Sequence, residues 1–308
     1  MCCVDRLRWQ AIPNTLSSIH YFGLLCCLAV VWSSSVLFIK IGVETVPPMS
    51  LAAGRILITT VLLCAALLWR RDALPMEGRL WRQCFVLAFV GNTLPYYLII
   101  WGEVDVDSAL AAILLSVMPL ATLVLAHLFT TDEKFTPLKV AGVVVGLVGV
   151  IILVGPEALG GLGDHLVRQL AVAGGAFCFA IQTVMARRLP KISPLTVSVV
   201  VMICALSQSL PMAFIVDWPI TTMPSAASWA AMIALGVFSG AVAAIVYFYL
   251  VAQRGATYVA LNNFLLPPLG VLWGFLFLDE RVAPQALAAL GVILIGIWLA
   301  TYRTKTQT

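Results

Sequence analysis

The sequence has few charged residues. Lys, Arg, Asp and Glu account for only 10% of its 308 residues, whereas hydrophobic residues account for 62%. Soluble domains carry about 25% charged residues, so this composition excludes an ordinary soluble domain. It is typical of a polytopic membrane protein.

Several chemical signatures are missing as well. The eight cysteines show no metal-ligand spacing and lie mostly in apolar runs, so we expect neither a metal site nor a disulfide scaffold. There is no Gly-x-x-x-x-Gly-Lys-Ser/Thr motif, so this chain is not expected to hydrolyse ATP, and we expect no other cofactor. The net charge is +4, but no basic cluster with interleaved aromatics lies outside the apolar segments, so we expect no nucleic-acid partner.

The first twenty residues, "MCCVDRLRWQAIPNTLSSIH", have no long apolar core. A signal peptide needs an apolar core of about 7 to 15 residues. We therefore interpret residues 1–20 as a cytoplasmic leader and residues 303–308 as a cytoplasmic tail.

Long apolar runs fill the rest of the chain. A helix needs about 20 apolar residues to cross the hydrocarbon layer, and runs of that length predict ten transmembrane helices and an all-α fold. The runs span residues 21–41, 49–69, 83–102, 108–130, 137–155, 169–186, 194–216, 228–251, 256–278 and 284–302.

Basic residues are distributed unevenly between the connecting loops. If the N-terminus is cytoplasmic, fourteen of the eighteen Lys and Arg residues fall on the cytoplasmic side. Lys40, Arg168 and Arg281 fall on the outer side, and Arg55 lies within the second span. Cytoplasmic loops carry an excess of Lys and Arg, so both termini are predicted to be cytoplasmic.

The chain also repeats itself. "TTDEKFTPLKVAG" from Thr130 and "FLDERVAPQALAALG" from Phe277 both carry Asp-Glu, a basic residue and then a proline. The matching pairs include Pro47 with Pro194, Pro137 with Pro284, Gly149 with Gly296, Gly91 with Gly240, and Pro119 with Pro268. A duplication of five helices has an odd number of crossings, which predicts two inverted repeats.

Four stretches together carry a family resemblance: "WSSSVLFIKIG", "GNTLPYYLIIWG", "ALAAILLSVMPLATLVLAHLF" and "ALNNFLLPPLGVLWGFLFLDER". The chain resembles the drug/metabolite transporter superfamily, with EamA-type five-helix repeats at residues 21–155 and 167–302. The resemblance implies a carrier with a central cavity between the halves. Its members mostly move amino acids, nucleotide-related metabolites or xenobiotics. One departure is "TTDEK", where the family more often has Gly-Glu.

Polar side chains within the spans are candidate substrate ligands, because polar groups in lipid are costly. Arg55 could bind a substrate carboxylate or extend to the outer interface. The asparagines could clamp a zwitterion or form interhelical hydrogen bonds. The predicted substrate-binding residues are Ser34, Arg55, Asn92, Tyr96, Gln182, Tyr247, Asn262 and Asn263.

Two prolines, Pro119 and Pro268, lie within spans at equivalent positions of the two repeats. A proline removes a backbone hydrogen bond and kinks a helix. Paired interruptions in the two halves of a carrier often mark the site or a hinge, so we predict hinges here, with passive kinking as the alternative.

These observations favour a secondary transporter of small organic metabolites that works by alternating access between the repeats. The family resemblance implies an exporter and substrates such as amino acids. We expect it in the plasma membrane, the inner membrane if the source is bacterial. Its expected partners are a small-molecule substrate and the bilayer, and the sequence leaves a homodimer open.

The alternative is an intramembrane hydrolase. The stretch "GVFSG" around Ser239 resembles the surroundings of a nucleophilic serine, but no histidine partner is found for it in a span. We do not expect an enzyme.

The inverted repeat predicts that Asp132 and Asp279 lie on opposite faces of the membrane. Each is replaced by cysteine in turn and labelled in intact cells with a membrane-impermeant thiol reagent. Asp279→Cys is expected to react from outside and Asp132→Cys only after the membrane is opened. Labelling of both from the same side would refute the inverted repeat.

Overall fold

The computed structural model describes residues 18–102, 105–106, 108–190, 192–217, 223–277 and 284–302. Within these ranges every regular element is a helix, which confirms the all-α fold class. Most of the predicted leader, the tail at 303–308, and the second Asp-Glu pair at Asp279 and Glu280 lie outside the described residues.

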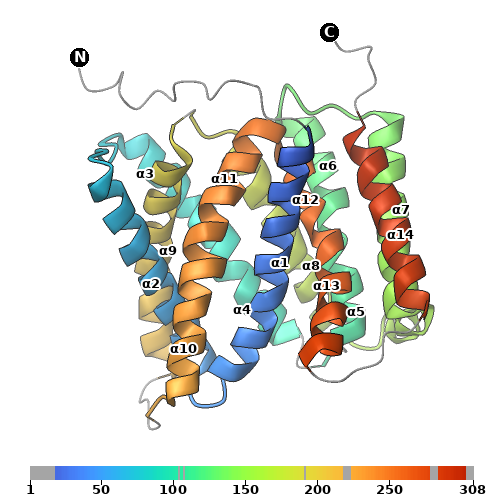
Figure 1. Ribbon diagram of the computed structural model, residues 1–308, viewed down its shortest axis with the longest axis horizontal. Helices are drawn as coiled ribbons and strands as arrows, with labels where there is room; N and C mark the ends of the chain where they lie inside the picture. The colour runs from blue at the N-terminus through green and yellow to red at the C-terminus, as the bar shows by residue number, and fades with distance from the viewer. Residues whose placement is uncertain are drawn as a thin grey trace. The chain divides into compact units, whose positions relative to one another are not determined.

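The helices follow the apolar runs closely (Figure 1). The first repeat holds α1 (Ser18–Gly42), α2 (Pro48–Trp69), α3 (Gly78–Ala88), the π-helix η2 (Phe89–Thr93), α4 (Leu94–Gly102), α5 (Ser108–Leu115), α6 (Met118–Phe129) and α7 (Pro137–Val154). A 3₁₀ turn, η3 (Pro156–Gly161), follows. The second repeat holds α8 (Leu166–Arg187), α9 (Pro194–Asp217), α10 (Ala226–Ala234), the π-helix η4 (Leu235–Val242), α11 (Ala243–Arg254), α12 (Ala256–Ala260), α13 (Asn262–Phe277) and α14 (Pro284–Thr301).

Seven helical stretches in the described part of the chain are long and apolar enough to cross a membrane. Residues 78–102, 256–277 and 284–301 supply further helix where the sequence also predicts spans. The chain is therefore a polytopic helical membrane protein. Ten crossings and two cytoplasmic termini remain predictions.

Proline and glycine mark several helix ends. The helices α2, α7, α9 and α14 begin at Pro48, Pro137, Pro194 and Pro284. Proline suits the first turn, where its missing N–H would have no partner in the helix. At the other end of α7, Gly155 has a φ of 102°, a conformation that favours glycine and ends the helix.

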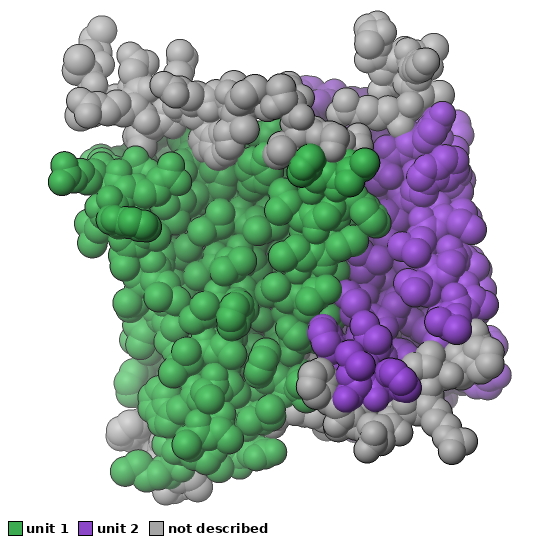
Figure 2. Space-filling model, in the orientation of Figure 1, with its two compact units in different colours: residues 1–93, 189–253 green, residues 94–188, 254–308 purple. Residues whose placement is uncertain are grey.

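The chain forms two compact units, coloured separately in Figure 2. Unit 1 consists of Met1–Thr93 and Leu189–Gln253, and unit 2 consists of Leu94–Arg188 and Arg254–Thr308. Each unit therefore combines helices from both sequence repeats. The predicted boundaries of the repeats, 21–155 and 167–302, describe the sequence duplication and do not coincide with these units.

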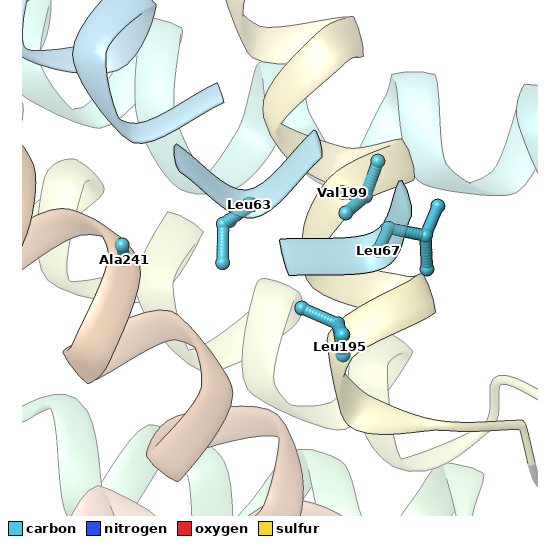
Figure 3. Close-up of a cluster of buried hydrophobic side chains, with 5 residues drawn as sticks. All are labelled: Leu63, Leu67, Leu195, Val199 and Ala241. Atoms are coloured by element: carbon cyan, nitrogen blue, oxygen red, sulfur yellow. The ribbon is translucent and has the colours of Figure 1, made fainter. Parts of the chain in front are cut away.

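In unit 1, α2 packs antiparallel to α9. Near the start of α2, the Ser50 N–H donates to the Asp217 carboxylate at the end of α9, at 2.6 Å. Near its middle, Thr60 Oγ1 lies 3.3 Å from the Met202 carbonyl oxygen. Towards its end, Leu63 and Leu67 share a buried cluster with Leu195, Val199 and Ala241 (Figure 3).

In unit 2, α7 and α14 make a close antiparallel contact through glycines. A Cβ atom on Gly142 would lie 2.3 Å from the Ala300 nitrogen, and one on Gly149 would lie 2.6 Å from Ile293 Cγ1. One on Gly296 would lie 2.5 Å from the Gly146 nitrogen. Small residues let helix backbones approach in lipid, where hydrophobicity does not drive helices together.

These two pairs join equivalent helices of the two repeats. The helix α2 corresponds to the second predicted span and α9 to the seventh, while α7 corresponds to the fifth predicted span and α14 to the tenth. Equivalent helices of an inverted repeat must run in opposite directions across a membrane. The antiparallel packing within each unit agrees with that requirement.

The glycine contact in unit 2 predicts a position-specific cost. Gly296→Ala places a methyl group against the backbone of α7 and should destabilise the protein by about 1 to 3 kcal/mol. The control, Gly291→Ala in the same helix, meets nothing within 4 Å. It should keep or raise stability, because alanine favours helix by roughly 1 kcal/mol over glycine. Thermal unfolding in detergent measures both, and equal midpoints would contradict the close packing.

Candidate functional site

The predicted substrate ligands divide between the two compact units. Unit 1 contains Ser34, Arg55, Asn92 and Tyr247. Unit 2 contains Tyr96, Gln182, Asn262 and Asn263, together with Pro119 and Pro268. Each unit therefore contributes both polar and aromatic candidates.

In unit 2, side chains from four helices form a connected group. The Tyr96 ring of α4 packs edge-on against Phe179 of α8, with 6.2 Å between ring centroids. Phe179 packs against a buried cluster that contains Met118 of α6. Asn263 of α13 donates a hydrogen bond from Nδ2 to the Met118 sulfur. Tyr96 and Asn263, two predicted ligands, thus belong to one contact network.

Asn262 lies next to this group and is 1% exposed. Among the described residues, neither its Nδ2 nor its Oδ1 has a hydrogen-bond partner. A buried polar atom without a partner costs roughly 1 to 3 kcal/mol, and most such atoms in proteins are paired. Asn262 leaves a donor and an acceptor available together, which suits a bound molecule that carries both.

Gln182 also belongs to α8, three residues beyond Phe179. Residues three apart lie on the same face of a helix. The side chain of Gln182 is half-buried. Its position is therefore compatible with the predicted role, which stays a prediction.

In unit 1, an aromatic pair mirrors the one in unit 2. The rings of Trp32 in α1 and Tyr247 in α11 have centroids 5.8 Å apart, and Tyr247 is buried. Trp32 and Phe179 occupy equivalent positions in the two repeats. In both units an aromatic from the first helix of one repeat therefore packs on a tyrosine from the third helix of the other.

The hydroxyl of Ser34 is already engaged. It donates to the Val31 carbonyl at 3.0 Å, within its own helix. The same carbonyl also accepts from Ser239 of η4, at 3.2 Å. Ser34 could still accept a hydrogen bond from a substrate, but its donor is used.

Arg55 lies half-buried in the second turn of α2, close to η4. A Cβ atom on Gly236 would lie 3.1 Å from the Arg55 carbonyl oxygen. Thr59 Oγ1 lies 2.8 Å from that carbonyl and 2.8 Å from the Gly236 carbonyl. The backbone of Arg55 is thus fixed against η4, while a substrate role for its side chain stays a prediction.

The two π-helices were missed from the sequence. A π-helix carries an extra residue in a turn, and such turns are frequent at functional sites. Gly91 of η2 and Gly240 of η4 are the equivalent glycines of the two repeats, and this pair is a signal that the sequence did offer. Asn92 lies within η2, and its buried Nδ2 has no hydrogen-bond partner among the described residues.

Gln208 of α9 is another residue that sequence analysis missed. Thr93 at the end of η2 donates to Gln208 Oε1 at 2.9 Å, and Gln208 Nε2 donates to the Phe85 carbonyl at 2.9 Å. One amide therefore binds both sides of the turn that contains Asn92. A polar residue in the middle of an apolar run was its signal in the sequence.

The two predicted hinge prolines have different surroundings. Pro119 lies in the first turn of α6, just after a break at Ser116 and Val117. Pro268 lies inside α13, and the break in that span occurs earlier, at Leu261. The paired prolines thus do not mark paired breaks, and their hinge role stays a prediction.

The described residues contain no group of three or more His, Cys, Asp or Glu side chains that could hold a metal. Their cysteines Cys26, Cys27, Cys64, Cys84, Cys178 and Cys204 are free thiols.

Comparison with known proteins identifies the architecture. The model of the EamA-like transporter family matches residues 21–155 and 168–302. An uncharacterized inner membrane transporter of Escherichia coli strain K12, YedA, is 28% identical over 283 residues, covering 91% of this chain and 90% of that protein. A probable terminal-alkyne amino-acid exporter of Streptantibioticus cattleyicolor is 26% identical over 285 residues, covering 91% of this chain and 93% of that protein.

A solved crystal structure shares the fold, with a TM-score of 0.78 and 22% identity. The match covers 92% of this chain and 97% of the other. The family match and the apolar helices identify an integral protein of the plasma membrane, which is the inner membrane in a bacterium. The chain belongs to the EamA-like transporter family.

Proposed function

We propose that this protein is a secondary carrier that exports small metabolites with adjacent donor and acceptor groups, such as amino acids. The observation that carries the proposal is Asn262, a fully buried amide with no hydrogen-bond partner among the described residues. Such a residue reduces stability, so a protein retains it more readily where a ligand uses it. The relative from Streptantibioticus, named as a probable amino-acid exporter, supports this substrate class.

The chemistry of the site fits a zwitterion. A carboxamide donates through its nitrogen and accepts through its oxygen, so it can bind a carboxylate and an ammonium group at once. In unit 2, Asn263 and Gln182 offer the same pair of groups, and Tyr96 lies in an aromatic pair that could contact an apolar side chain. Unit 1 by itself offers Asn92 and the aromatic pair of Tyr247.

Transport would proceed by alternating access. We propose that each compact unit moves as one body during transport. The sequence repeats are less suited to this role, because each unit contains antiparallel helices from both repeats. The chain leaves unit 1 after Thr93, the last residue of η2. We assign the change in helix geometry to the two π-helices, with Pro119 and Pro268 as further candidate hinges.

The hydrolase alternative finds no support. The hydroxyl of Ser239 donates to the Val31 carbonyl, whereas a nucleophilic serine donates its proton to a base. We propose that the protein is not an enzyme. The proposal applies equally to a monomer and to a homodimer.

The proposed carrier function predicts substrate counterflow. Purified protein in liposomes loaded with unlabelled amino acids is expected to accumulate the labelled counterpart of at least one amino acid transiently above equilibrium, because a carrier exchanges substrate across the membrane. Liposomes without protein provide the control. Absence of counterflow across the complete amino-acid panel, with folded protein present, would count against this substrate class.

A substitution of Asn262 should separate the effect on stability from the effect on transport. Asn262→Leu removes an unsatisfied buried amide, so the thermal midpoint in detergent should stay equal or rise. Transport should fall at least about tenfold, because a substrate loses its hydrogen bonds to that amide.

Thr196→Val is the matched control. The Thr196 Oγ1 is likewise buried without a hydrogen-bond partner among the described residues, but it lies in α9 and is not a predicted ligand. It should stabilise the protein and leave transport unchanged. If Asn262→Leu transported at the rate of the unmodified protein, Asn262 would not be a ligand.

A further inference from the structure

The loop after α6 carries a buried carboxylate that the substrate site does not use. Glu133 is 7% exposed. Its Oε1 accepts the N–H of Ala256 at 2.5 Å, and its Oε2 accepts the N–H of Thr257 at 2.8 Å. Both carboxylate oxygens are therefore bound to the first turn of α12, more than a hundred residues away in the sequence.

The backbone at this junction is adapted to the carboxylate. Gly255, which precedes α12, has a φ of 93°. A Cβ atom there would lie 2.6 Å from Glu133 Oε1. Glycine is required both for the positive φ and for the close approach of the carboxylate.

A positive charge balances the loop. Arg187, the last residue of α8, pairs with Asp132, with its Nε 3.1 Å from the Asp132 carboxylate, and the same Nε lies 4.0 Å from Glu133 Oε1. Partial burial raises the pKa of Asp132, but the hydrogen bond and charge of Arg187, a backbone hydrogen bond and the charge of Lys139 together hold that pKa below its ordinary value. The loop is thus fixed to α8 as well as to α12.

The helix that Glu133 binds leads directly to the amides. All five residues of α12 are buried, and Asn262 follows after Leu261. Ala256 packs with Ala126 and Val184, and Ala260 packs with Met118. Asn262 is therefore separated by one residue from the short helix whose first turn Glu133 holds.

We propose that Glu133 is a positioning residue for the substrate site, which sets the placement of Asn262 and Asn263 by holding the first turn of α12. This inference rests on the proposed function, because it concerns how those amides meet the substrate. Glu133 itself does not contact the substrate.

The test is Glu133→Gln, which keeps the shape of the side chain. Glutamine retains one acceptor oxygen but turns an NH₂ group towards a backbone N–H. Amide exchange in peptides covering residues 255–261 should rise about tenfold, as expected when a hydrogen bond to a charged acceptor is lost. The KM for counterflow should rise several-fold. The thermal midpoint should fall modestly, because two N–H donors then face each other at a buried position, while the exchange of α2 stays close to that of the unmodified protein.

Glu77→Gln is the matched control, because Glu77 also precedes a helix but is exposed and caps nothing. It should change neither exchange nor KM. Gly255→Ala provides an independent variant, since its methyl group would displace the Glu133 carboxylate. It should reproduce the local rise in exchange, and adding Glu133→Gln should increase that rise little further.

The outcomes separate the two proposals. Unchanged exchange at residues 255–261 in Glu133→Gln would overturn the capping role, whatever the transport assay gives. Increased exchange with an unchanged KM would overturn the positioning role. Absence of counterflow by the unmodified protein would reject the proposed function, while the exchange experiment would still test the hydrogen bonds of Glu133.

Discussion

Hydrocarbon offers no hydrogen bonds, and the structure depends on that constraint. Every backbone N–H and C=O within the membrane must find a partner inside the protein, which favours helices throughout. Lipid also removes the hydrophobic drive for helices to associate, so packing must come from close contact. The glycines Gly142, Gly149 and Gly296 allow that contact between α7 and α14. Close packing of equivalent helices within each unit follows from these two requirements.

The same constraint separates ordinary polar residues from functional candidates. Thr59 and Thr60 return their hydroxyl protons to carbonyls one turn earlier in α2, at 2.8 Å and 2.7 Å. Ser34 does the same in α1, so its presence in a span needs no ligand. Asn262 has no such local solution, because neither amide atom reaches a partner among the described residues. Local satisfaction thus weakens the case for Ser34 as a donor and strengthens the case for Asn262.

The sequence predicted the features that depend on composition and spacing. Apolar runs gave the helices within a few residues, and paired prolines and glycines gave the repeat that the family match contains. It did not predict η2, η4 or the break at Leu261, because these depend on contacts between distant helices. Gln208 illustrates the reason: its amide binds Thr93 and Phe85, more than a hundred residues away. The residue pattern within one span cannot show which residue of a distant helix will be the hydrogen-bond partner.

The Asp-Glu pair after α6 also depends on distant partners. In the sequence, its charges only marked the loop between two predicted spans. In the structure, Asp132 pairs with Arg187 outside the apolar segment, whereas Glu133 is buried against backbone N–H groups. A buried carboxylate is costly unless each oxygen is bound, and the first turn of a helix supplies free N–H donors for that purpose. Two adjacent acidic residues therefore have different roles: Asp132 fixes the loop to α8, and Glu133 connects the loop to the helix that leads to Asn262.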